Sequence, residues 1–133
     1  MITKFRDGKG KELAISALKD FIIDLRKRYE VYLLLDNPMS AYLDPKSMMK
    51  NRLSYFFGDT FSVSSEQLSL NEELKAAGIE SGARVIDQIQ HLCPDNNCRR
   101  YAPAGTPIYK DNSHMRPYFV IENASFMDIA WKK

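Results

Sequence analysis

The sequence feature that most constrains the fold is the short apolar run VYLLLD at residues 31–36. Its apolar residues do not alternate with polar ones, which predicts a β-strand that is buried on both faces. Asp36-Asn37-Pro38 is expected to end this strand abruptly. Residues 11–29 predict an amphipathic helix before it, because apolar side chains recur at helical spacing at Ala14, Leu18, Phe21, Ile22, Leu25 and Tyr29.

Start signals predict three more helices. Asp44 is expected to cap a helix that has Pro45 at its first position and ends at Gly58. Its inner face would carry Met48, Met49, Leu53, Phe56 and Phe57. Ser64 and Gln67 have the spacing of a capping box, so a further helix should begin there and end near Gly78. The last helix is expected to open at Pro117, with Val120, Ala124, Met127 and Trp131 on one face.

The remaining strands complete an alternating order of elements. Residues 83–87 predict a second short strand, and residues 106–111 are a candidate for a third. Strands that alternate with helices indicate the α/β class, with a short parallel sheet and helices on both faces. A parallel sheet of two or three strands leaves an apolar edge unpaired. We therefore expect the chain to be half of a larger α/β domain.

Chain length and net charge restrict the classes of function that the chain can have. A chain of 133 residues is expected to form a single domain, residues 1–133. A formal net charge of +2 is too small to predict a nucleic-acid partner. The sequence has neither an apolar stretch of roughly 18 residues, as a membrane span needs, nor a signal-peptide pattern. A location outside the cytoplasm would then depend on a segment that this chain lacks.

The two cysteines, Cys93 and Cys98, enclose the turn-forming residues of CPDNNC. A turn there should bring the two sulfurs close together. Three states remain open: a disulfide, which would indicate an oxidising compartment, two free thiols, or a zinc site completed by His91 and His114. The zinc reading is the weakest of the three, because the two histidines are isolated and do not form the second closely spaced ligand pair of zinc motifs.

A candidate catalytic pair lies in YKDNSHMRPYFV, where Asp111 precedes His114 by three residues. Histidine can remove a proton from a nucleophile at neutral pH, and a neighbouring carboxylate can orient the ring and stabilise its charged form. In the simpler alternative, Asp111 caps the loop or the last helix and His114 is half exposed.

Four stretches, taken in order, resemble the SGNH (GDSL-like) domain that is appended to membrane acyltransferases of the acyltransferase-3 family. They are VYLLLDNP, YLDPKSMMKNRL, ARVIDQIQHLCPDNNC and GTPIYKDNSHMRPYFVIENASFMD, and the similarity spans roughly residues 11–130. The resemblance implies a flavodoxin-like three-layer α/β/α fold and serine-dependent acyl transfer or ester hydrolysis, without a cofactor. Asp111 and His114 match the acid and base of the family's triad, and Cys93 and Cys98 match a turn that can be disulfide-bonded in a periplasmic domain. Such enzymes typically O-acetylate envelope polysaccharides.

The resemblance also implies partners. The family's Gly-Asp-Ser block and oxyanion residues lie upstream of the region matched here. Gly58-Asp59-Thr60 is no substitute for that block, because it has threonine for serine and follows a predicted helix rather than a strand. The chain is thus expected to be the C-terminal portion of the domain and inactive alone. Its partners would be the upstream half of the domain, the acyltransferase membrane domain and a polysaccharide acceptor.

A non-enzymatic function is the alternative. In that case, the chain is a small α/β module that forms a homodimer, or binds another partner, through its open sheet edge.

Overall fold

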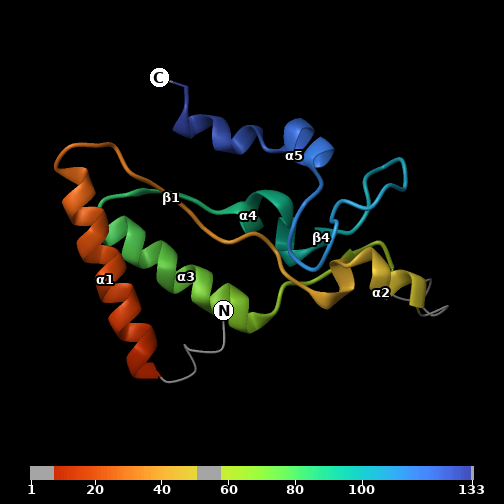
Figure 1. Cartoon of the computed structure of the whole chain (residues 1–133), viewed down its shortest axis with the longest axis horizontal. Helices are drawn as coiled ribbons and strands as arrows, with labels where there is room; N and C mark the ends of the chain where they lie inside the picture. Colours follow the sequence, from red (N-terminus) through yellow and green to blue (C-terminus); the bar gives the residue numbers. More distant parts are fainter. Residues whose placement is uncertain (1–7, 51–57, 133) are drawn as a thin grey trace. The chain divides into compact units, whose positions relative to one another are not determined.

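The computed structural model describes residues 8–50 and 58–132, and the side chains of residues 48–50 are outside the description. The chain forms two compact units. Figure 1 labels their main helices and strands. The first unit contains residues 8–35 and 69–86, and the second contains the remaining described residues. The expectation of a single domain stays a prediction.

The first unit is built on a parallel pair of strands, β1 (Tyr32–Leu34) and β3 (Arg84–Ile86), in which Leu33 lies opposite Val85. Two helices, α1 (Gly8–Arg26) and α3 (Ser65–Glu80), belong largely to this unit and are joined by an ion pair between Lys11 Nζ and Glu73 Oε1 at 2.6 Å. The expected α/β class with a short parallel sheet is therefore confirmed.

Gly78 explains how α3 approaches the sheet. A Cβ atom at this position would lie 2.7 Å from Leu33 Cδ2 and 2.9 Å from Val85 Cγ2. Gly78 was expected to end the helix, but α3 continues to Glu80, and Gly82 follows with φ +81°. The glycine at 78 thus permits close packing, while the one at 82 provides the left-handed turn after the helix.

Burial in the first unit differs from the sequence prediction. Ile22 is buried as expected, whereas the side chains of Phe21 and Tyr29 are 61% and 65% exposed. Leu34 is 43% exposed, so the expectation that the first strand is buried on both faces is wrong at that residue. Successive strand residues point to opposite faces, and α3 covers the face that carries Leu33.

The second unit contains a short antiparallel pair, β2 (Thr60–Phe61) and β4 (Cys98–Arg99), which the sequence patterns did not predict. Its helical elements are η2 (Ala41–Leu43), α2 (Pro45–Lys50), α4 (Gln88–Leu92), η4 (Pro94–Asn96), α5 (Pro117–Asn123) and η5 (Ser125–Ala130). Two apolar clusters support these elements. One is centred on Val63, Ile89 and the two cysteines, and the other on Leu43, Ile108 and Tyr109.

The start signals in this unit are correct, but two extents are not. Asp44 caps α2 through a 2.8 Å hydrogen bond from the Lys46 amide, and Pro117 opens α5. The last helix is interrupted after Asn123, where a 3₁₀ helix replaces it. The candidate third strand at residues 106–111 forms only isolated antiparallel bridges, so it does not extend the parallel sheet. The predicted inner face at Leu53, Phe56 and Phe57, like the side chains of Met48 and Met49, lies outside the described residues.

Candidate functional site

The candidate catalytic pair lies on a tight turn that leads into α5. Tyr109 and Met115 form an antiparallel bridge, and the Lys110 amide donates to the His114 carbonyl at 2.9 Å. Tyr109 is 2% exposed, and burial raises the pKa of its hydroxyl to about 12. The base of the turn is thus anchored in the second unit, while residues 111–114 form its tip.

Asp111 organises this tip through its own carboxylate. Asp111 Oδ1 accepts hydrogen bonds from the His114 amide at 2.7 Å and from the Ser113 amide at 3.0 Å. These two backbone donors, with a smaller contribution from the His114 ring, lower the pKa of Asp111 from 3.8 to about 2. The carboxylate is therefore ionised throughout the neutral range.

The same carboxylate contacts the histidine ring. Nδ1 of His114 lies 2.9 Å from Oδ2 and 3.0 Å from Oδ1 of Asp111. A carboxylate only accepts hydrogen bonds, so Nδ1 carries the proton and, in the neutral ring, Nε2 is the basic nitrogen. The side chain of His114 is 69% exposed, which leaves its ring accessible to a further group. Loop capping and contact with the ring were alternatives in the sequence, and one aspartate performs both.

Ser113 is the nearest hydroxyl along the chain, with Oγ 3.4 Å from His114 Nδ1. The hydroxyl therefore lies close to the ring. However, it lies at the nitrogen that Asp111 already occupies. In a serine triad the nucleophile and the carboxylate contact different ring nitrogens. Ser113 is consequently in the wrong place to act as the nucleophile.

Two neighbours of the turn were not predicted from the sequence. Asn37 Nδ2 donates to the Ser113 carbonyl, and the Ser40 amide donates to the Asn112 carbonyl at 3.0 Å. Asn37 lies within the abrupt strand end at Asp36-Asn37-Pro38, and Ser40 follows it. That turn signal was recognised, but nothing in the sequence indicates that its side chain reaches a loop more than seventy residues away.

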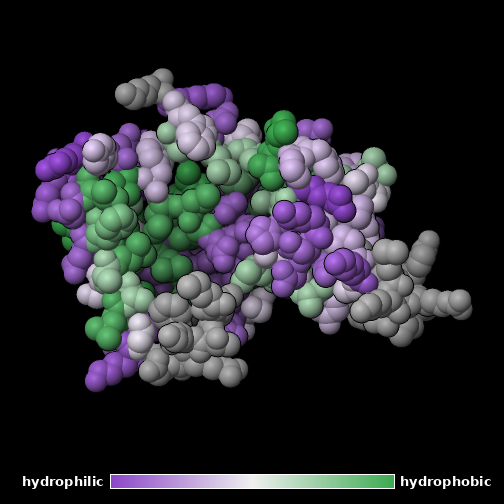
Figure 2. Space-filling model, in the orientation of Figure 1, coloured by the Kyte–Doolittle hydropathy of each residue, from purple (hydrophilic) through white to green (hydrophobic). Residues whose placement is uncertain are grey.

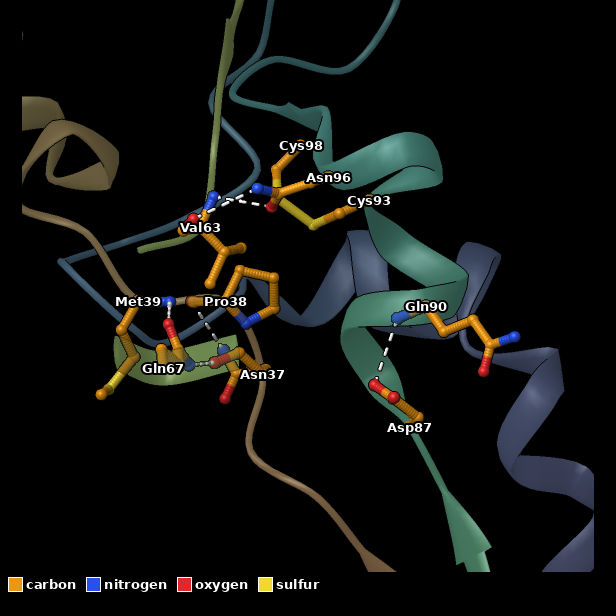
Figure 3. The surroundings of a disulfide bond; sticks show 10 residues. All are labelled: Asn37, Pro38, Met39, Val63, Gln67, Asp87, Gln90, Cys93, Asn96 and Cys98. Atoms are coloured by element: carbon orange, nitrogen blue, oxygen red, sulfur yellow. Dashed lines mark hydrogen bonds between the residues drawn. A yellow bond between two sulfur atoms is a disulfide. The ribbon is translucent and has the colours of Figure 1, made fainter. Parts of the chain in front are cut away.

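The cysteine turn is closed by a disulfide between Cys93 and Cys98 (Figure 3). This pairing confirms one of the three states left open and overturns the other two, because both sulfurs are used. The exposed ring of His91 stacks on Phe126, with ring centroids 4.6 Å apart, instead of joining a metal site. Within residues 8–50 and 58–132, no group of three or more His, Cys, Asp or Glu side chains could hold a metal ion.

Comparison with known proteins supplies the family. Residues 2–124 match the family model described as the SGNH domain fused to AT3 domains. No curated protein and no solved structure matches the sequence. Fusion to AT3 domains associates this family with acyltransferases and implies a membrane-associated parent protein. In the described part of the chain itself, no helix has the length and apolar character to cross a bilayer. The match covers most of the sequence, and the chain therefore belongs to the family of SGNH domains fused to AT3 domains.

Proposed function

We propose that the chain supplies the general base, His114, and its orienting carboxylate, Asp111, for serine-dependent acyl transfer. The observation that carries this proposal is the contact between Nδ1 of His114 and the carboxylate of Asp111, at 2.9 and 3.0 Å, on a ring that is 69% exposed. The family's association with acyltransferases supports the same chemistry.

In the proposed mechanism the two ring nitrogens of His114 have different roles: Nδ1 contacts Asp111, and Nε2 transfers the proton. Nε2 of His114 takes the proton from a serine hydroxyl as its oxygen attacks the acyl carbonyl, and then returns the proton to the leaving group. In the second half, Nε2 takes the proton of the acceptor hydroxyl as it attacks the acyl-serine, and returns that proton to the departing serine oxygen. Asp111 holds the ring in the required tautomer and stabilises the imidazolium in both halves. The serine and the oxyanion donors come from a segment outside the described residues.

The proposed acyl group is acetyl, and the proposed acceptor is an envelope polysaccharide on the periplasmic side of the bacterial inner membrane. The resemblance to SGNH domains of acyltransferase-3 proteins leads to this substrate class. The disulfide between Cys93 and Cys98 supports the compartment, since such bonds persist in oxidising surroundings.

The test is acetyl transfer to polysaccharide by the full-length parent protein. His114→Ala should lower kcat by about a millionfold if all transfer passes through the triad, and Asp111→Asn by about ten-thousandfold. His91→Ala is the matched control, because His91 is the only other histidine and lies on α4. Near-wild-type transfer by Asp111→Asn would refute the assignment.

A second assay uses the 133-residue chain by itself. We expect it to hydrolyse p-nitrophenyl acetate no faster than its His114→Ala variant, because a base without its nucleophile and oxyanion donors contributes little. A clear difference in rate between the two chains would contradict the assignment of the nucleophile to another segment.

A second candidate function is self-association through the sheet edge. Among the described residues, the parallel sheet consists of β1 and β3 alone, and two-stranded parallel sheets are not expected to be stable without further strands or cover. Figure 2 shows apolar side chains gathered over the region of α1 and β1, and exposed residues there include Leu13, Phe21, Ile23 and Leu34. Sedimentation at low micromolar concentration tests this candidate, and a strict monomer would eliminate it.

A further inference from the structure

The side chain of Gln67 makes contacts that its position in the helix does not require. The Ser64 hydroxyl accepts a 3.2 Å hydrogen bond from the Gln67 amide, as the expected helix cap does. In a full capping box the glutamine side chain would turn back to the amide of residue 64. Instead, Gln67 Nε2 donates to the Asn37 carbonyl at 2.8 Å, and Gln67 Oε1 accepts from the Met39 amide at 3.2 Å (Figure 3).

These two hydrogen bonds hold both sides of Pro38, whose side chain is fully buried. We call Asn37, Pro38, Met39 and Gln67 the Asn37 bracket. A side-chain amide that pairs with a backbone carbonyl and a backbone amide in this way imitates a strand partner. The bracket thereby fixes the backbone from which the Asn37 side chain projects.

The Asn37 side chain connects the bracket to the catalytic turn. Its Nδ2 donates to the carbonyl of Ser113, the residue immediately before His114. The neighbouring Asn112 carbonyl accepts from the Ser40 amide at 3.0 Å, so two consecutive carbonyls of the tip are held by residues 37–40. Both contacts lie within the second unit.

We propose that Asn37 is a positioning residue for His114, and that Gln67 acts through Asn37. This inference rests on the proposed function and adds to it the residues that aim the base. The carboxylate of Asp111 orients the ring relative to the turn, but it belongs to the same turn and cannot place that turn in the molecule. The ring itself is mostly exposed, so packing does not hold it either. The donors from residues 37–40 therefore supply the anchorage at the tip.

The test compares Asn37→Leu with Asn97→Leu in the full-length parent protein. Leucine has the same branching at Cγ as asparagine, but two methyl groups replace the amide and no donor remains. Asn97 is an exposed asparagine, and its side chain makes no hydrogen bond to any described residue. We expect Asn37→Leu to lower kcat about tenfold with KM changed less than about twofold, since a displaced base weakens the transition state more than substrate binding. Asn97→Leu should behave as wild type.

A second variant guards against misfolding of the first. Gln67→Met removes both bracket hydrogen bonds but leaves Asn37 in place, and should lower kcat by about threefold as Asn37 loses its fixed backbone. In an Asp111→Asn background, Asn37→Leu should have less than about a twofold further effect, because the base is already misdirected. A fully additive tenfold loss there, or kcat unchanged in both single variants, would overturn the inference.

A measurement independent of activity separates this inference from the proposed function. The Ser113 and His114 amides both donate to Asp111, and their hydrogen exchange should be faster in the Asn37→Leu chain than in wild type or Asn97→Leu. Faster exchange with fully active Asp111→Asn would refute the catalytic role and leave the anchorage standing. Unchanged exchange with inactive Asp111→Asn would refute the anchorage alone.

Discussion

The contact between Asn96 and Val63 yields the most direct prediction for stability. Asn96 lies in the disulfide turn, and its Oδ1 accepts from the Val63 amide at 2.9 Å while its Nδ2 donates to the Val63 carbonyl at 3.2 Å (Figure 3). Val63 is 4% exposed and belongs to the apolar cluster around the disulfide. Asn96→Ala therefore leaves a buried amide and a buried carbonyl without partners.

The size of the effect follows from two contributions. The two neutral hydrogen bonds contribute about 1 kcal/mol each. This is a lower bound, because the substitution leaves the buried amide and carbonyl of Val63 without a partner. Asn96 also has φ +58°, a left-handed conformation that asparagine tolerates and that costs alanine about 1 kcal/mol. The free energy of unfolding should thus fall by about 3 kcal/mol, a large fraction of the roughly 5–15 kcal/mol that stabilises a typical domain.

Urea denaturation of the oxidised chain measures this loss directly. Asn96→Gly should lose only about 2 kcal/mol, because glycine accepts the positive φ but not the hydrogen bonds. Asn97→Ala, next in the chain and exposed, should change stability by less than about 0.5 kcal/mol. If Asn96→Ala falls within that same small range, the two hydrogen bonds do not support the turn and the reasoning fails.

Three other predictions concern pH, redox state and packing. Folding lowers the pKa of Asp111, so the stability that its carboxylate contributes is present above pH 4 and is lost as the pH falls towards 2. The difference in Tm between wild type and Asp111→Asn should therefore close over that interval. A constant difference would contradict the role of the backbone donors. The Cys93–Cys98 disulfide closes a loop of only a few residues, so its reduction by dithiothreitol should lower the free energy of unfolding by only about 2 kcal/mol. Complete unfolding at neutral pH would refute this local role. Gly78→Ala should destabilise the chain in thermal melts, because overpacking against Leu33 and Val85 costs about 1–3 kcal/mol and exceeds the gain in helix propensity of about 1 kcal/mol. Gly8→Ala, where no atom lies within 4 Å of the added Cβ, is its control, and equal stability of the two variants would contradict the close packing.

Several sequence predictions depended on local chemistry, and these are confirmed. Asp44 caps its helix and Pro117 opens another, because a side-chain acceptor and a missing amide act within one turn of backbone. The pairing of Asp111 with His114 is likewise a property of four consecutive residues, whose carboxylate reaches two amides and the ring. The catalytic use of that pair remains a prediction.

The sequence predictions were wrong for residues whose environment depends on distant segments of the chain. Gln67 forms only half of a capping box, since its side chain bonds to residues 37 and 39 instead. Phe21 lies on the apolar stripe of its helix and is nevertheless exposed, because periodicity predicts which residues share a face but not what covers that face. The two-residue strands β2 and β4 are too short to produce any periodic pattern.

The sequence by itself determined the α/β class, a strand within residues 31–36, which the structure has at Tyr32–Leu34, and the proximity of Asp111 to His114. Each follows from neighbours along the chain. Tertiary structure alone decided that the cysteines join each other, that Ser113 contacts the wrong ring nitrogen, and that Asn37 holds the turn. The physical reason is the range of the interactions. Caps, turns and periodicity act over a few residues, whereas the anchorage of an exposed turn needs donors that only folding brings to it.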